Sequence, residues 1–147
     1  MREIKFRAWL EGTHDNLTFS EPTMDYNVTL SQEGFWCDVE GSWDIHGAYS
    51  TIPIMQFTGL HDKNGTPIYE GDILREEPKN DWEKTNYSSF EVFFHDGDAN
   101  VDYNIGFTMG RMKCHGAIAG GYTPSFKPKT VNEMIVIGNI YENPDLI

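Results

Sequence analysis

Four oxygen-bearing side chains alternate along residues 96–102 in a pattern that could wrap a calcium ion. They are Asp96, Asp98, Asn100 and Asp102. Carboxylate and amide oxygens suit this hard cation, but an EF-hand loop also needs Gly at its sixth position and Glu at its twelfth. The chain has Val101 and Phe107 at those positions. We therefore interpret the segment as a hydrated β-turn and predict no metal site.

Cys114 and His115 could supply a pair of zinc ligands or an activated thiolate. Zinc needs four thiolate or imidazole ligands at suitable spacing, and the remaining candidates, Cys37, His46 and His95, are scattered singly. A cysteine nucleophile needs a base beside it, yet neighbouring residues of a strand point to opposite faces. Neither chemistry is predicted.

Glycines crowd residues 116–121, and two carboxylates adjoin at Glu76 and Glu77. A phosphate-binding loop would continue into Lys and then Ser or Thr at the start of a helix, and this segment does not. Acid catalysis by a carboxyl group needs an apolar environment, whereas Glu76 and Glu77 lie in a polar stretch. We expect a protein without catalytic residues and without a cofactor.

Tryptophans and acids gather in the first third of the chain, in a combination typical of a surface for a basic partner. The predicted partner-binding residues are Asp25, Glu33, Trp36, Asp38, Glu40, Trp43 and Asp44, with Trp82 as a further candidate. Trp is enriched at binding hot spots, and a charged rim steers an oppositely charged partner. Asp38 and Glu40 on one strand would project about 6.6 Å apart, a spacing that permits nucleic-acid mimicry. The alternative is that the aromatic residues form core and the acids are merely exposed.

The charge balance points the same way. The formal net charge is −12, and no Lys or Arg occurs between Arg7 and Lys63. Such a chain resists unassisted binding to nucleic acid or to an anionic membrane surface. The acidic segment is either a solvated, solubilising face or an electrostatic surface for a basic partner.

Length and cysteine content predict one cytoplasmic domain over residues 1–147. The chain is long enough to bury a core, and its two cysteines suit free thiols in a reducing compartment. No apolar run approaches the roughly 20 residues that span a bilayer, and the first residues carry charges where a signal peptide would be apolar.

Residues 54–75 carry the strongest local structural signal. Asp62-Lys63-Asn64-Gly65 is a turn between apolar stretches, so a hairpin is predicted from 54–57 to 67–69. Pro67 is tolerated at a strand start, and Glu70-Gly71-Asp72 bends the chain into a further strand at 73–75. Strand, tight turn, strand and kink are how small curved barrels begin.

The other strands are predicted from alternation of apolar and polar residues. The first covers residues 4–8 with Lys5 and Arg7 facing outwards, and residues 10–22 form a loop or a short hairpin pivoting near 14–16. Further strands are predicted at 26–30, 35–39, 90–94, 102–109 and 134–137. Residues 76–89 are predicted as a long polar excursion, and helices as few and short. Residues 110–121 hold many small residues, and 116–121 are expected to form a flexible turn or to pack tightly in a strand.

Three blocks of the chain resemble the YopX family of phage and prophage proteins. They are Met1–Trp9, Met55–Leu74 and Val136–Leu146. The resemblance implies a cytoplasmic phage accessory protein that is often oligomeric, and it supplies no catalytic residues. The expected fold is mainly β, with a small barrel-like antiparallel core near 1–9, 54–75, 90–94 and 134–141. Residues 10–53 and 76–130 are expected to be loop or hairpin elaborations.

The leading functional hypothesis is a non-enzymatic effector that binds and inhibits a basic host protein, such as a nucleic-acid-processing or anti-phage defence protein. One alternative is an oligomeric sponge for a small nucleotide signal. Its cations would come from Arg75, Arg111, Lys113, Lys127 and Lys129. A second alternative is a structural or assembly protein that only self-associates.

Overall fold

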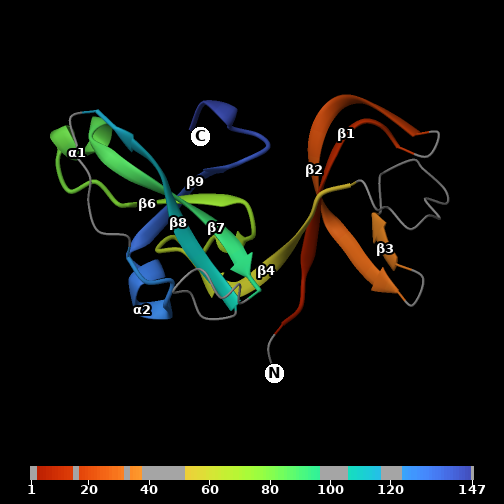
Figure 1. Ribbon diagram of the computed structural model, residues 1–147, viewed down its shortest axis with the longest axis horizontal. Helices are drawn as coiled ribbons and strands as arrows, with labels where there is room; N and C mark the ends of the chain where they lie inside the picture. The colour runs from red at the N-terminus through yellow and green to blue at the C-terminus, as the bar shows by residue number, and fades with distance from the viewer. Residues whose placement is uncertain are drawn as a thin grey trace. The chain divides into compact units, whose positions relative to one another are not determined.

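The computed structural model describes residues 3–14, 17–31, 34–37, 52–96, 106–116 and 124–146 (Figure 1). It divides the chain into two compact units, Met1–Phe57 and Thr58–Ile147, called unit one and unit two below. The mainly antiparallel β architecture with few, short helices is confirmed. The expectation of one domain over the whole chain stays a prediction.

Unit one is a set of antiparallel strands. Its strands are β1 (Phe6–His14), β2 (Leu17–Ser31), β3 (Gly34–Cys37) and the first residues of β4 (Ile54–His61). The hydrogen-bonded order is β3, β2, β1, β4, and the pairs include Ala8 with Asp25 and Thr29 with Trp36. The predicted hairpin near residues 14–16 is confirmed and is much longer than expected. Strand β2 includes the strand predicted at 26–30, and β3 covers the first part of the one predicted at 35–39.

Strand β1 corrects one prediction. Residues 7–10 are all buried, Arg7 is 3% exposed, and Ile4 is 66% exposed. The reason is a register irregularity between Phe6 and Ala8, which breaks the alternation of faces expected of a regular strand. The Arg7 guanidinium therefore faces inwards, and its Nε donates to Met55 Sδ at 3.4 Å.

Unit two contains the predicted hairpin and a four-stranded sheet. Strand β4 continues through the turn at 62–65 into β5 (Pro67–Tyr69), as the turn chemistry predicted. Gly65 adopts φ +84°, a conformation that side chains with a Cβ rarely reach. The sheet has the order β8, β7, β6, β9. Its strands are β6 (Asp72–Glu76), β7 (Tyr87–His95), β8 (Gly106–His115) and β9 (Met134–Asn139).

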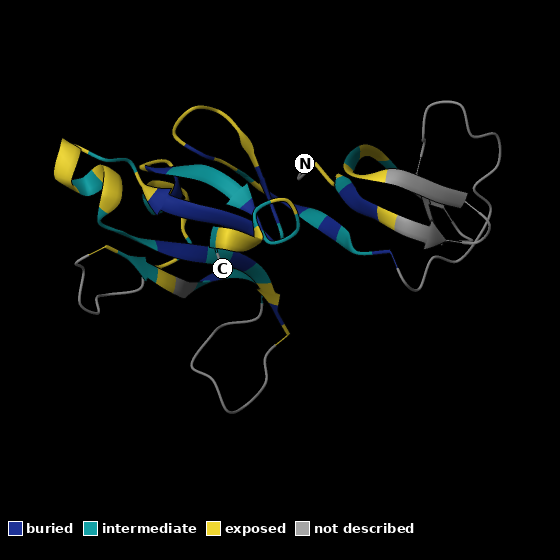
Figure 2. Cartoon of the chain, turned by 90° about the horizontal axis from the view of Figure 1, so that it is seen from above, coloured by how far each residue is buried: buried dark blue, intermediate teal, exposed yellow. Residues whose placement is uncertain are grey.

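One face of this sheet supplies the core of unit two. Seven buried residues form the cluster: Ile68, Leu74, Phe90, Val92, Met109, Val131 and Met134. Val131 comes from the short helix α2 (Pro128–Val131), and a 3-10 turn, η1 (Pro144–Leu146), follows β9. Figure 2 shows the buried residues concentrated on these strands. In the described ranges, no helix is both long and apolar enough to cross a membrane.

Two further predictions are corrected in unit two. Residues 76–89 are not an open excursion, because they contain helix α1 (Asp81–Thr85) and the start of β7. Strand β8 runs on to His115, beyond the end predicted at residue 109, because its pairing with β7 extends to Tyr87. Long-range pairing decides the strand parts of these segments, and local composition does not reveal it.

Candidate functional site

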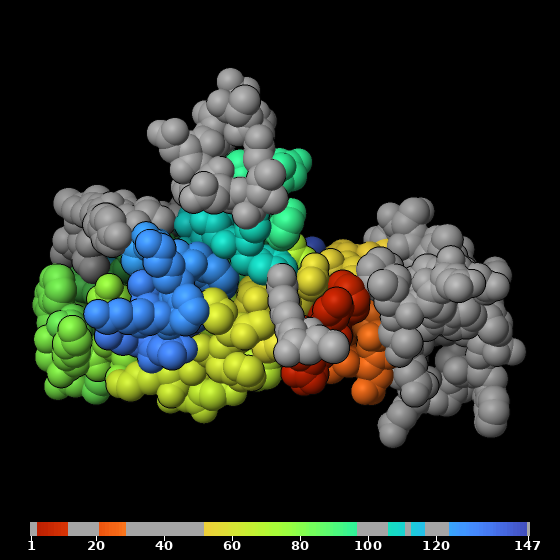
Figure 3. Space-filling model, turned by 90° about the horizontal axis from the view of Figure 1, so that it is seen from below, coloured from red at the N-terminus to blue at the C-terminus, as the bar shows by residue number. Residues whose placement is uncertain are grey.

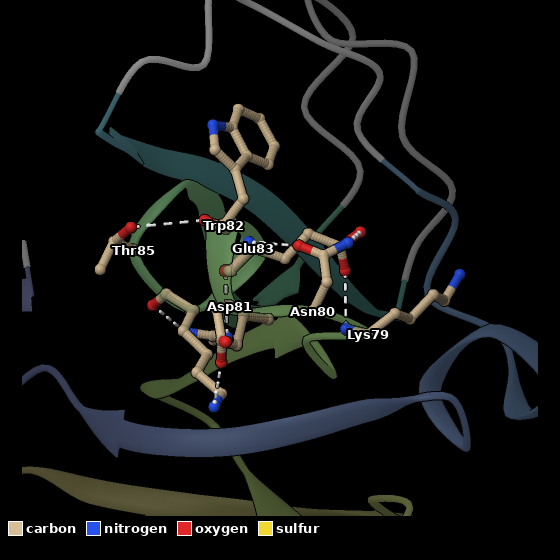
Figure 4. Close-up of polar contacts among 8 residues, drawn as sticks. Lys79, Asn80, Asp81, Trp82, Glu83 and Thr85 are labelled. Atoms are coloured by element: carbon tan, nitrogen blue, oxygen red, sulfur yellow. Dashed lines mark hydrogen bonds and ion pairs between the residues drawn. The ribbon is translucent and has the colours of Figure 1, made fainter.

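Helix α1 is short, so its ends decide whether it forms. Asn80 is the N-cap: its Oδ1 accepts from the Glu83 amide at 2.9 Å and its Nδ2 donates to Glu83 Oε1 at 2.8 Å. The Lys79 amide donates to Glu83 Oε2 at 2.7 Å. This reciprocal cap satisfies amide groups that the first helical turn leaves without partners. Figure 4 shows these contacts on one side of the helix and the Trp82 indole pointing away from them.

The C-terminal end of α1 is held by the sheet. Arg75 donates from its two terminal nitrogens to the carbonyls of Lys84 and Glu83, at 3.3 and 3.4 Å. A cation at the last carbonyls of a helix is favoured by their partial negative charge. Asn86 closes the end by donating its backbone and side-chain N–H groups to Trp82 O, at 3.1 and 2.7 Å.

Arg75 also belongs to a stack of side chains. Its guanidinium lies 4.0 Å from the centroid of the Tyr87 ring, which stacks on the His115 ring at 4.3 Å and 19°. Burial, with Lys113 and Arg75 adding positive charge nearby, lowers the pKa of His115 below its ordinary value. Ser89 Oγ lies 3.3 Å from His115 Nε2 and is fully buried, so this Ser–His pair is structural.

A cavity of about 200 Å³ opens beside α1. Its lining includes two acids, Glu76 and Glu83, and three aromatic residues, Trp82, Tyr87 and Phe90. No lysine or arginine is among its lining residues in the part of the chain that the structure describes. We call this feature the α1 cavity. Trp82 is 58% exposed, and α1 is largely exposed in Figure 2 and at the surface in Figure 3, coloured green.

A second, larger cavity of about 380 Å³ shares Glu76 with the first. Its lining carries both signs of charge: Lys63, Glu76, Glu77, Lys79 and Glu133, with Thr130 and Asn132. Lys63 and Glu77 form an ion pair in its wall. Because lysines and glutamates are mixed in its lining, this cavity selects less sharply for one sign of ligand than the α1 cavity does.

Most of the predicted partner-binding residues lie outside the described residues. These are Glu33, Asp38, Glu40, Trp43 and Asp44, while Trp36 is described only as a backbone position in β3. Asp25 lies on β2, half-buried, and its Oδ1 accepts from the Asn27 amide at 2.8 Å. Among the candidates whose side chains the structure describes, Trp82 lines a cavity. The acids of the α1 cavity, Glu76 and Glu83, were not predicted as site residues. The spacing of Asn80 and Glu83 is typical of a helix N-cap and could have indicated the helix.

Some of the candidates for metal or nucleophile chemistry lie among the described residues. In the described ranges, no three His, Cys, Asp or Glu side chains gather as metal ligands, and residues 97–102 of the calcium-like loop lie outside those ranges. Cys114 Sγ contacts Ser88 Oγ at 3.7 Å, whereas His115 contacts Tyr87 and Ser89. The two neighbours have separate surroundings, as predicted for adjacent residues of a strand.

The chain is similar to known proteins over nearly its whole length. The family model described as YopX protein matches residues 5–147. The chain belongs to the YopX family. Among solved structures it is similar to protein EF1440 from Enterococcus faecalis, with 26% identity, 99% of each chain covered and a TM-score of 0.52. A search of curated proteins found no match.

Two of the YopX-like blocks meet in unit two, where buried polar side chains hold the chain together. Asp62 accepts from the amides of Asn64 and Thr66 at 2.8 Å and, across to β9, from the Val136 amide at 3.0 Å. Asn139 Oδ1 accepts from the amides of Tyr141 and Glu142 at 3.0 and 2.9 Å.

A glycine completes this part of the YopX-like fold. Gly138 has φ +156°, and a Cβ there would lie 2.2 Å from Asn143 Oδ1. The Asn143 oxygen in turn accepts from the Asn139 amide at 3.1 Å. These block residues therefore have structural roles in turns and strand ends, and the α1 cavity is built mainly from residues outside the blocks.

Proposed function

We propose that this YopX-family protein is a non-catalytic phage or prophage effector that binds and inhibits a basic host protein in the cytoplasm. The observation that supports this most directly is Trp82, a large aromatic side chain exposed beside a cavity lined by acids. Exposed aromatics within a charged rim are the usual anchors of protein interfaces. The net charge of −12 adds long-range attraction for a basic partner.

The acidic segment that precedes β4 belongs to the same proposal. Asp38, Glu40 and Asp44 lie in a stretch without Lys or Arg, so their charges attract basic proteins over a distance of several ångströms even when salt is present. The segment and the α1 cavity are tested separately, because each can contact a partner by itself.

Two of the cations named for the nucleotide-sponge alternative already have partners within the fold. Arg75 is 8% exposed and bound to α1 and Tyr87, so it is not available to a ligand. Lys113 donates to the Asp145 carbonyl at 3.3 Å. A thermal-shift screen with cyclic nucleotides separates the two functions, because a ligand at a hundredfold its Kd should stabilise the fold by about 2.7 kcal/mol.

Capture from host lysate, read by quantitative mass spectrometry, tests the binding function. We expect the wild-type protein to enrich a basic protein, and we expect both Trp82→Ala and the triple reversal D38K/E40K/D44K to lose at least about tenfold of that enrichment. The matched control is E3K/E21K/D96K, which changes the net charge by the same amount as the triple reversal, at exposed positions that belong neither to residues 38–44 nor to the lining of the α1 cavity. Equal loss of enrichment in the control would show that net charge alone causes the loss seen in the triple reversal. Unchanged capture by both test variants would refute the proposal.

A further inference from the structure

The α1 cavity has a chemistry that selects among the side chains of a basic partner. We propose that it takes the guanidinium group of a single arginine, which stacks on Trp82 and pairs with Glu76. This inference rests on the proposed function and adds to it the identity of the recognised group. Three observations carry it: the distribution of charge around α1, the aromatic surface that is exposed there, and the size of the cavity.

The acids around α1 differ in how they are neutralised. Glu77 is paired with Lys63, and Asp81 with Lys84 at 2.6 Å. Glu83 uses its two oxygens in the cap, accepting from the Lys79 amide and the Asn80 side chain. Glu76 is exposed, and among the described residues its carboxylate has no ion-pair partner. The α1 cavity thus contains one carboxylate that a cation from outside can pair with.

The aromatic residues of the cavity favour arginine over lysine. Tyr87 is already stacked with Arg75 and His115, whereas the Trp82 indole is more than half exposed. A planar guanidinium can stack on an indole face while its N–H groups pair with a carboxylate at its edge. An ammonium group is a strongly hydrated point charge that cannot do both in the same way.

The size of the cavity favours one side chain over a nucleotide. Pockets for drug-sized ligands usually measure about 300–1,000 Å³, and the α1 cavity measures about 200 Å³. The larger mixed-charge cavity is the comparison within the same unit. One ion pair lies in its wall, and its described lining residues include no aromatic side chain on which a guanidinium could stack.

Titration with short peptides, followed by the indole N–H resonance of Trp82 in ¹H–¹⁵N spectra, tests this inference. The resonance is identified as the one absent from Trp82→Phe. The probes are one capped peptide with a central arginine and the same peptide with citrulline or lysine in its place. Citrulline keeps the shape of arginine and removes the charge. We expect the arginine peptide to shift the resonance, with the citrulline peptide at least about tenfold weaker and the lysine peptide weaker as well.

Two acid-to-amide variants locate the contact. Glu76→Gln should abolish the shift, and Glu77→Gln should leave it unchanged, because Glu77 lines only the larger cavity. Unperturbed amide resonances elsewhere show that each variant is folded. Equal shifts with arginine, lysine and citrulline, or equal loss in both variants, would overturn the inference.

The result can be separated from the fate of the proposed function. If wild-type protein captures a basic host protein and the arginine peptide leaves Trp82 unmoved, the recognised group is wrong and the binding function stands. If nothing basic is captured, the binding function fails, whatever the peptide does.

Discussion

Glu91 is a partly buried carboxyl group on the strand β7. It lies in the middle of β7, opposite Ile73 of β6 and Gly110 of β8. Burial raises the pKa of Glu91 above its ordinary value, because desolvation penalises the charged form. Below its unfolded pKa of about 4.3 the Glu91 carboxyl group causes no loss of stability. The free energy of unfolding then falls as pH rises through the folded pKa, because the buried group becomes charged.

Replacing Glu91 with Gln should stabilise the protein at neutral pH. The amide cannot ionise, so the desolvation cost of the carboxylate is removed at pH 7, whereas near pH 4 both side chains are neutral. We expect a higher Tm for the variant at pH 7 and equal Tm values near pH 4, measured by circular dichroism. Exposed Glu21→Gln is the control and should show no such pH dependence. A lower Tm for Glu91→Gln at pH 7 would contradict the argument.

Asp62 illustrates the opposite case, a buried carboxylate whose partners are in place. It is 5% exposed and accepts three backbone N–H groups from two segments of unit two. Asp62→Asn puts an amide donor where one of these N–H groups points. Because hydrogen bonds to charged groups contribute about 1.5–3 kcal/mol each, we expect a loss of about 2–4 kcal/mol in the free energy of unfolding. Urea denaturation measures it, with exposed Asp145→Asn as the control; equal midpoints for the two variants would refute the role.

At the scale of elements, α1 depends on its caps. A five-residue helix is not stable by itself, since nucleation is costly, so its boundary contacts must hold it. Asn80→Ala removes the acceptor of the Glu83 amide and should cost about 1 kcal/mol. The readout is hydrogen exchange, in which the Glu83 amide should lose protection while the amides of β6 and β7 keep theirs. Asn80→Asp retains the acceptor and serves as the control; loss of protection in that variant too would contradict the cap.

The elements that could be predicted from sequence are those decided by local chemistry. The turn at Asp62–Gly65 and the strand after Pro67 are encoded by residues next to one another. Helix α1 was missed because five residues cannot show a helical period, and only the Asn80–Glu83 spacing indicates it. The burial of Arg7 was missed because a register irregularity leaves no local trace. The α1 cavity was missed for a related reason. Glu77 pairs with Lys63, which is distant in sequence, so the sequence does not reveal that Glu77 has an ion-pair partner while the neighbouring Glu76 has none among the described residues.

At the scale of the whole molecule, the dominant property is the net charge of −12. Like charges repel one another in the folded state, and salt screens this repulsion as the Debye length falls from about 10 Å at 0.1 M to about 3 Å at 1 M. The same screening weakens attraction between the protein and a basic partner. Fold stability and partner capture should therefore respond to salt in opposite directions.

Raising sodium chloride from about 0.05 M to about 0.5 M should increase Tm and reduce capture of the basic partner in the same series of samples. D38K/E40K/D44K, which halves the net negative charge, is expected to show a smaller increase in Tm. A capture yield that is insensitive to salt would mean that the interface is apolar, and would count against the acidic surface.

The contact between the 62–65 turn and β9 has a further consequence. Strand β9 is the last strand of its sheet, and its Met134 carbonyl and Val136 amide are occupied by the Lys63 amide and the Asp62 carboxylate. If these groups were left unpaired, the edge of the sheet could template the addition of strands from other molecules. We expect that loosening the turn, by Asp62→Asn or by heat, would let copies of the protein polymerise through this edge into fibrils, so that the hairpin turn also protects the protein against self-templated assembly.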